Sequence, residues 1–189
     1  MTIKPFFYLF TTILVWGSSF PAMSYLLKDL NPMELALGRF LLPGILGLLY
    51  FLKTNLKISI RDYFRFFLSG FFGIFLYNFF LNTGQTSVSA GASSFIVNCN
   101  PLFAFLIGFY VLKQKIKAYY WIGIIICIVG VFIISLERQL DTILNKGAFL
   151  IFFAAFLTAS YFHIVKPLID KYGVAVSYTH LTLPTNDRV

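Results

Sequence analysis

Two side chains in this sequence have the types that could form a catalytic dyad. Ser93 lies in a GASS stretch at positions 91–94, and His163 lies in a separate apolar segment much farther along the chain. A histidine activates a serine hydroxyl as a nucleophile when the two groups lie about 3 Å apart. Whether these two can meet depends on the elements that carry them.

A second group of polar residues falls in the first half of an uncharged stretch at 91–112. Ser94, Asn98 and Pro101 share one stripe at helical spacing, and Ser93 and Asn100 share a neighbouring stripe. A helix that faces lipid carries hydrocarbon at such positions, so this arc is expected to face protein or water. The segment from Asn98 to Pro101 is predicted to be broken or kinked, and this polar half is where a function is expected.

The composition places the chain among membrane proteins. Hydrophobic residues make up 59% of it, charged residues 12%, and the mean hydropathy is +0.82, whereas about a quarter of the residues of a soluble domain are charged. Cys99 and Cys127 lie in apolar segments and predict no disulfide framework. The chain has no metal-ligand spacing, P-loop or glycine-rich nucleotide motif, so no metal, cofactor or ATP-driven pump is expected.

The apolar runs predict an all-α integral membrane fold with six transmembrane helices, because about 20 apolar residues cross a bilayer. The expected helices span 6–27, 34–52, 66–82, 91–112, 119–136 and 147–165. The residues from Lys53 to Arg65 and from Thr83 to Ala90 are expected to be connections, and a loop is expected after Pro167. Pro21 predicts a kink in the first helix.

The basic residues predict one orientation in the membrane, with the N-terminus in the cytoplasm. Ten lysines and arginines fall on the expected cytoplasmic side, which are Lys4, Lys53, Lys57, Arg61, Arg65, Lys113, Lys115, Lys117, Lys166 and Lys171. Three fall on the opposite side, which are Lys28, Arg138 and Lys146. The net charge of +8 is thus a topology signal, and no nucleic-acid partner is expected.

The same topology separates the two members of the candidate dyad. Ser93 falls near the outer start of the fourth helix and His163 near the inner end of the sixth. At 1.5 Å per residue their depths differ by roughly 20 Å, so an enzyme is not expected.

Several other polar or small residues are expected to join helices. Arg39 lies inside the second helix, where it either snorkels to the near interface or packs against a loop or another helix. Ser69 with Gly73, and Ala155 with Ala159, have the spacing that lets helix backbones approach closely. Tyr77, Asn78 and Asn82 are candidates for interhelical hydrogen bonds or ligand contacts. No carboxylate is expected within the helices.

Four segments together resemble the EamA family of the drug/metabolite transporter superfamily. They are LVWGSSFPA at 14–22, the Arg39-Phe40 pair, GQTSVSAGASSFIVNCNPLF at 84–103 and WIGIIICIVGVFIIS at 121–135. The resemblance implies ten helices in two five-helix repeats of opposite orientation, which is the inverted-repeat plan of secondary transporters. Residues 1–136 would be the first repeat, and 137–176 a loop and the first helix of a second, truncated repeat.

The resemblance also implies a central cavity lined partly by helices one, three, four and six. The substrate-binding residues that it assigns to this cavity are Trp16, Ser19, Tyr77, Asn98 and Tyr161. No residue is assigned a catalytic or metal-binding role.

The last residues, 177–189, are expected to be a non-native tail. Positions 177–185 read SYTHLTLPT, which closely resembles one translated reading frame of a common transposon-based sequencing adapter. Native sequence is therefore expected to end near Val176, with the gene continuing beyond it.

The function predicted is secondary transport or export of small metabolites across the cytoplasmic membrane, by a chain that is an incomplete fragment. The expected partners are the lipid bilayer, a small-molecule substrate and, as an option, a second copy in a homodimer. Two alternatives stay open, which are a non-transporting six-helix assembly protein and a rhomboid-like intramembrane serine protease.

Overall fold

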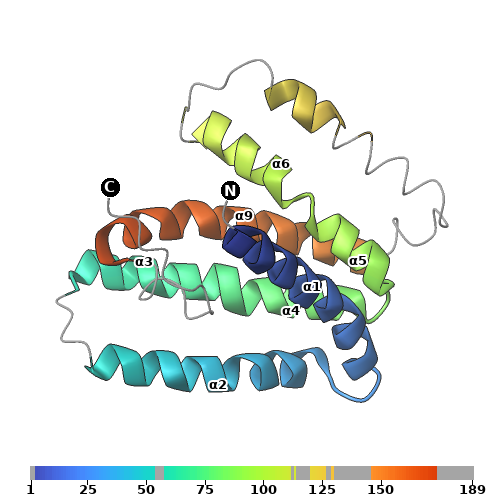
Figure 1. The fold of residues 1–189 in the computed structure, drawn as a ribbon, viewed down its shortest axis with the longest axis horizontal. Helices are drawn as coiled ribbons and strands as arrows, with labels where there is room; N and C mark the ends of the chain where they lie inside the picture. The colour runs from blue at the N-terminus through green and yellow to red at the C-terminus, as the bar shows by residue number, and fades with distance from the viewer. Residues whose placement is uncertain are drawn as a thin grey trace.

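A computed structural model of the chain describes residues 3–53, 58–111, 113, 120–126, 129 and 146–173 (Figure 1). Within this part of the chain all regular secondary structure is helical. Five stretches are long and apolar enough to cross a membrane, which are Pro5–Leu26, Pro32–Lys53, Ile60–Gln85, Ala90–Val111 and Lys146–Tyr172. The predicted all-α integral membrane fold is confirmed. Most of the expected helix at 119–136 lies outside the described residues. The part of it that is described, residues 120–126 and 129, is helical.

The first two spans are α1 (Ile3–Leu26), which continues through Pro21, and α2 (Pro32–Lys53). Asn31 caps α2, because its Oδ1 accepts hydrogen bonds from the backbone amides of Met33 and Glu34 at 3.0 and 2.9 Å. Glu34 returns the bond by accepting from the Asn31 amide at 2.9 Å. This reciprocal capping box satisfies amides that have no partner inside the helix. It fixes the tight turn between α1 and α2.

The third span begins earlier and ends later than the sequence predicts. It consists of α3 (Ile60–Gly70), the π-helical η1 (Phe71–Leu76) and α4 (Tyr77–Gln85). The expected connection from Lys53 to Arg65 is wrong for its second half, because Ser59 caps α3 and accepts from the Asp62 amide at 3.3 Å. Arg61, Asp62 and Arg65, which suggested a loop, therefore lie in the first helical turns of α3. The expected loop at 83–90 is shorter too, since α4 runs to Gln85.

The fourth span is divided near its middle. It consists of α5 (Ala90–Val97), α6 (Asn100–Leu106) and the π-helical η2 (Ile107–Val111). Pro101 has no amide hydrogen to donate to the Val97 carbonyl, which removes the bond that would join the two halves. Asn98 and Cys99 between them have ψ angles of −1° and −6°. The predicted break or kink at Asn98–Pro101 is confirmed.

The last described span, α9 (Lys146–Tyr172), is longer than the expected helix 147–165. The expected loop after Pro167 is wrong, because a proline removes a single hydrogen bond and the next turn is held by the fully buried Leu168. The helix ends at Gly173, whose φ of +83° suits glycine and terminates a helix. Lys166 and Lys171 therefore lie on the helix itself.

The third and fourth spans pack against α9, whereas α2 packs against α4 and α1 against α5 and α4. A larger share of α9 is buried than of α1 or α2. Ile151, Ala154, Ala155 and Ala159 are fully buried on it, as the small-residue spacing of Ala155 and Ala159 predicts. Figure 1 shows α9 lying along α3 and α4, with α2 on the opposite side of α4.

The third span and α9 run antiparallel in a fixed register. Asp62 meets Lys171 near one end, Gly73 meets Tyr161 in the middle, and Gly84 meets Gly147 at the other end. Close approach of a neighbouring backbone was expected at Gly73 from its spacing with Ser69. The close neighbour found there is a side chain, because the Tyr161 ring fills the place that a Cβ on Gly73 would take. This interface positions Tyr77 and Tyr161, two of the five candidate site residues.

Candidate functional site

The five residues assigned to a substrate path lie on four different spans. Trp16 is 71% exposed on α1, and the Ser19 hydroxyl donates to the Trp16 carbonyl at 2.6 Å. Such a bond satisfies a hydroxyl within its own helix. The polar group of Ser19 is therefore stable at membrane depth without a partner from another helix.

The two tyrosines belong to the interface between the third span and α9. Tyr161 on α9 lies against the backbone at Gly73, one turn before Tyr77. Tyr77 is half-buried and packs against the apolar core formed by Met23, Leu81 and their neighbours. Gly73 lies in η1, and π-helical segments of this kind occur often at functional sites.

Asn98 lies at the break in the fourth span. Its side-chain amide donates to the Ser94 carbonyl at 2.8 Å, and the residue is exposed. Two residues later, Oδ1 of Asn100 is buried and accepts no hydrogen bond from any described group. The break therefore presents an exposed amide and an unpartnered acceptor close to the middle of a membrane span.

A polar junction joins α1, α2 and α4, and only part of it was predicted. Asn78, Asn82 and Gln85 are buried on one face of α4 at positions i, i+4 and i+7. The Asn82 amide donates to the Pro32 carbonyl at 3.1 Å, and the Gln85 amide donates to the Phe20 carbonyl at 2.8 Å. The expected role of Asn82 in joining helices is confirmed. Gln85 was missed because it was assigned to a loop, although its spacing from Asn82 is helical.

The side-chain amides of Asn82 and Gln85 each also have a carbonyl oxygen that accepts no described hydrogen bond. Oδ1 of Asn82 and Oε1 of Gln85 are buried and have no hydrogen-bond donor within the described structure. Leaving a buried acceptor unpaired costs about 1–3 kcal/mol. The junction can therefore accept donors from water or from another polar group.

Arg39 packs against other helices, which decides between its two expected roles. Its Nη1 donates to the Met23 sulfur at 2.8 Å and to Oδ1 of Asn78 at 3.4 Å. Its guanidinium lies 5.6 Å from the centre of the Phe40 ring. The side chain thus bridges α2 to α1 and α4, and the packing role is confirmed over simple snorkelling.

A groove of about 240 Å³ lies between α2 and the η1–α4 segment. Its lining consists of Met33, Ala36, Leu37, Phe40, Leu41, Ile74, Phe75, Asn78 and Phe79. Asn78 is the polar member of this lining, and it also accepts the hydrogen bond from Arg39. The groove is therefore apolar on most of its surface, with a polar junction behind one wall.

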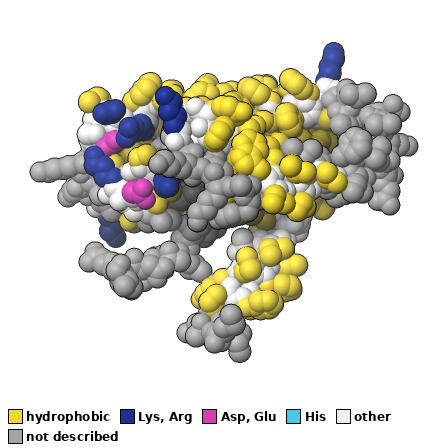
Figure 2. Space-filling model, turned by 90° about the horizontal axis from the view of Figure 1, so that it is seen from above, with side chains coloured by type: hydrophobic (Ala, Val, Ile, Leu, Met, Phe, Trp, Pro, Cys, Tyr) yellow, Lys and Arg dark blue, Asp and Glu magenta, His cyan; other side chains and the backbone are white. Residues whose placement is uncertain are grey.

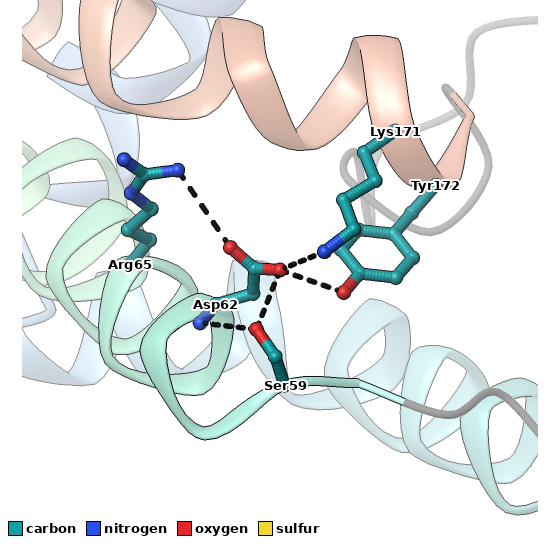
Figure 3. Close-up of polar contacts among 5 residues, drawn as sticks. All are labelled: Ser59, Asp62, Arg65, Lys171 and Tyr172. Carbon is teal, nitrogen blue, oxygen red and sulfur yellow. Dashed lines mark hydrogen bonds and ion pairs between the residues drawn. The ribbon is translucent and has the colours of Figure 1, made fainter.

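A charged cluster ties α3 to the last turn of α9 (Figure 3). Asp62 is 4% exposed, and its Oδ2 accepts from Lys171 Nζ at 2.5 Å, from the Tyr172 hydroxyl at 2.8 Å and from the Ser59 hydroxyl at 2.8 Å. Arg65 lies 3.6 Å from Oδ1. The expectation that no helix carries a carboxylate is therefore wrong.

Ser93 and His163 have separate partners. The Ser93 hydroxyl donates to the Val88 carbonyl at 3.4 Å, and His163 Nε2 lies 3.0 Å from the Ala104 carbonyl on α6. Ala104 follows Ser93 by 11 residues in a span that crosses the membrane, which corresponds to about 16 Å along a helix. The geometry therefore keeps the two apart, as the depth argument predicts. Across the residues with described positions, no three His, Cys, Asp or Glu side chains could hold a metal ion.

The model of the EamA-like transporter family matches residues 3–136. The uncharacterized transporter YdfC of Bacillus subtilis (strain 168) is 32% identical over 160 residues, covering 84% of this chain and 52% of the relative. An uncharacterized transporter of Archaeoglobus fulgidus is 29% identical over 171 residues, covering 90% of this chain and 60% of the relative.

The chain spans only about half of the length of these curated relatives. No solved structure matches it. The match to the family model nevertheless covers most of the chain, and the spans it covers have the length and apolarity of membrane helices. The chain therefore belongs to the EamA-like transporter family.

Proposed function

We propose that this chain is part of a secondary transporter that moves small metabolites across the cytoplasmic membrane. The solute path is lined in part by Trp16, Ser19, Tyr77, Asn98 and Tyr161. The observation that carries the proposal is the divided fourth span, with Asn98 exposed between α5 and α6. Secondary transporters bind their substrates near the bilayer midplane at helices interrupted in this way.

The hydrogen-bond acceptors without a described donor support a polar path close to α4 and α6. Asn82, Gln85 and Asn100 each keep one buried oxygen without a described donor. Such groups persist in membrane helices mainly where they serve a solute or an ion. Uncharged acceptors and aromatic rings fit amino acids, other metabolites and drugs alike.

The orientation proposed has the N-terminus in the cytoplasm. Seen from above, charged side chains gather at the end of the molecule where α3 begins and α9 ends, and hydrophobic side chains cover much of the remaining surface (Figure 2). The basic residues of that end include Arg61, Arg65, Lys166 and Lys171, and Lys28 follows α1 at the opposite end. An excess of basic residues marks the cytoplasmic side.

In this proposal residues 1–136 form the first repeat and α9 is the first helix of a second, inverted repeat. The chain spans only about half of the length of its relatives, which supports a truncated second repeat. Residues 177–189 are part of this proposal as a non-native tail. Alternating access moves one repeat against the other, so the 189-residue chain alone is expected to carry no complete transport cycle. A homodimer of the completed protein is compatible with this arrangement.

A solute panel tests the proposed transport. The gene is completed from long-read sequencing of its locus, and the full-length protein is reconstituted in liposomes that contain amino acids, other metabolites or drugs. Flux of at least one class above that of protein-free liposomes is expected, and the 189-residue chain should give none. An authentic stop codon directly after Val189, or equal flux from the short chain, would contradict the fragment proposal. No flux of any class by the full-length protein would contradict transport.

A further inference from the structure

Arg39 carries a positive charge inside a membrane span, and no described carboxylate neutralises it. It follows Pro32, the first residue of α2, by seven positions, which is about 10 Å along the helix axis. Among the residues with described positions, both ion pairs are made by Asp62 on α3. Glu34, the acidic residue of α2, accepts a hydrogen bond from the Asn31 amide. A charge at such a depth is costly unless an opposite charge compensates it.

The guanidinium of Arg39 also has donors to spare. It carries five N–H groups, and its described hydrogen bonds, to the Met23 sulfur and to Oδ1 of Asn78, both start from Nη1. The edge formed by Nε and Nη2 donates to no described group. Such an edge binds a carboxylate or a phosphate through two parallel hydrogen bonds. Arg39 is exposed as a residue, so an anion from outside the described helices can reach it.

The apolar groove between α2 and the η1–α4 segment lies directly beside this charge. Asn78, which accepts the hydrogen bond from Arg39, lines the groove, and so does Phe40, whose ring centre is 5.6 Å from the guanidinium. On α2 the lining forms a single stripe at helical spacing, which consists of Met33, Ala36, Leu37, Phe40 and Leu41. This stripe extends for about 12 Å from the first turn of the helix.

The rim of the groove faces the surroundings of the protein. Leu37 and Leu41 are 60% and 63% exposed on α2, and Phe75 is 48% exposed on the facing segment. Figure 1 shows α2 at the edge of the described helices, next to α4. Because α2 is long and apolar enough to cross a membrane, this edge faces hydrocarbon. The groove can therefore be entered from the bilayer.

The size of the groove fits a narrow apolar group. Its volume of about 240 Å³ is below the ~300–1,000 Å³ that pockets for drug-sized ligands have. A hydrocarbon chain fits a shallow groove of this kind, and the guanidinium beside it requires an anion. Charge and shape together therefore indicate an amphiphile with a negative head group.

We propose that Arg39 and the groove form a binding site for an anionic phospholipid. The phosphate pairs with the guanidinium of Arg39, and one acyl chain lies in the groove between α2 and the third span. Basic residues between membrane helices bind the head groups of anionic lipids. Side chains on a helix lean toward its N-terminus, so Arg39 leans toward the end of α2 that lies at the membrane surface. This site goes beyond the proposed transport, because it requires no solute flux.

Lipid binding to the 189-residue chain tests the proposal. The chain is purified in detergent, titrated with dioleoyl phosphatidylglycerol, and its lipid adducts are counted by native mass spectrometry. Dioleoyl phosphatidylcholine has the same chains without net charge, and glycerol phosphate has the anion without a chain. Phosphatidylglycerol should bind about fivefold more tightly than phosphatidylcholine, and glycerol phosphate should give no adduct at the same concentration.

Matched variants separate the head group from the acyl chain. Arg39→Gln should lower the affinity for phosphatidylglycerol to that for phosphatidylcholine. Lys28→Gln removes one exposed charge from the turn before α2 and should leave the affinity unchanged. Ala36→Phe fills the groove and should weaken the binding of both lipids, whereas Ala22→Phe, at an exposed position of α1, should not. The Ala36 pair keeps the contacts of Arg39, so the test stays decisive if Arg39→Gln fails to fold.

Four results would overturn the proposal. Equal affinity for the two lipids, or an equal loss in Arg39→Gln and Lys28→Gln, would show that no specific head-group site exists. Unchanged binding in Ala36→Phe would show that no chain enters the groove. Glycerol phosphate binding as tightly as the lipid would assign Arg39 to a soluble anion. The measurement reads binding and not flux, so its outcome is independent of the transport proposal.

Discussion

Gly84 on α4 and Gly147 on α9 face each other so closely that neither position has room for a side chain. A Cβ on Gly84 would lie 2.5 Å from the Gly147 carbonyl oxygen and 2.6 Å from Ile151 Cγ1. The pair lies where α9 begins and the third span ends. It sets the register along which the rest of α9 packs.

Gly84→Ala and Gly147→Ala should each destabilise the chain by about 1–3 kcal/mol, because an added methyl group forces two backbones apart. The midpoint of unfolding in a denaturing detergent titration, followed by circular dichroism, measures this loss. Gly17→Ala and Gly38→Ala are matched controls, since a Cβ there meets nothing within 4 Å. Equal stability of the two groups would contradict the close crossing.

Gly73→Ala should be destabilising for a different reason, since the new methyl group would overlap the Tyr161 ring. Adding Tyr161→Ala should recover part of the loss, because the double variant has room for the methyl group. Coupling of about 0.5–3 kcal/mol is expected between contacting residues. Strictly additive effects in a double-mutant cycle would argue that the two positions do not touch.

Gln85→Leu should cost about 1–2 kcal/mol in stability through the loss of two hydrogen bonds to α1. These bonds reach the Phe20 carbonyl and the Ser24 hydroxyl, both at 2.8 Å. Ser18→Ala is the control, because its hydroxyl bonds to the Val15 carbonyl within α1. A loss no greater than that of the control would mean that Gln85 does not tie α4 to α1.

Ser89→Ala should reduce stability by about 1 kcal/mol, since Ser89 caps α5. Its hydroxyl accepts a hydrogen bond from the Ala92 amide at 3.3 Å. Ser160→Ala removes a hydroxyl that bonds within its own helix, and it should change the unfolding midpoint less. The reverse order of the two effects would show that the cap contributes little.

The apolar runs and Pro101 were sufficient to predict the membrane class and the divided fourth span. The starts and ends of helices were predicted less well, because charged residues were read as loops. Ser59 followed by Asp62 has the spacing of a capping box and could have located the start of α3. Gly173 could likewise have marked the end of α9.

The partners of buried polar groups could not be predicted from the sequence. Asp62 and Lys171 are 109 residues apart, and Gln85 and Phe20 are 65 apart. Their meeting depends on the register between helices, which close backbone contacts such as Gly84 with Gly147 determine. Local patterns contain no information about that register. A close neighbour at Gly73 could be predicted, because Ser69 and Gly73 are small residues one turn apart on the same span.

The central claim is that Asn98, at the break in the fourth span, and Tyr161, on α9, line a solute path. Initial transport rates of the full-length protein in liposomes, for the solute with the highest flux, test it most directly. Asn98→Ala and Tyr161→Ala should each lower the rate by about tenfold, the equivalent of ~1.4 kcal/mol, and Phe162→Ala, next to Tyr161 and exposed, should leave it nearly unchanged. Unchanged rates in the first two variants, or an equal loss in all three, would contradict the account.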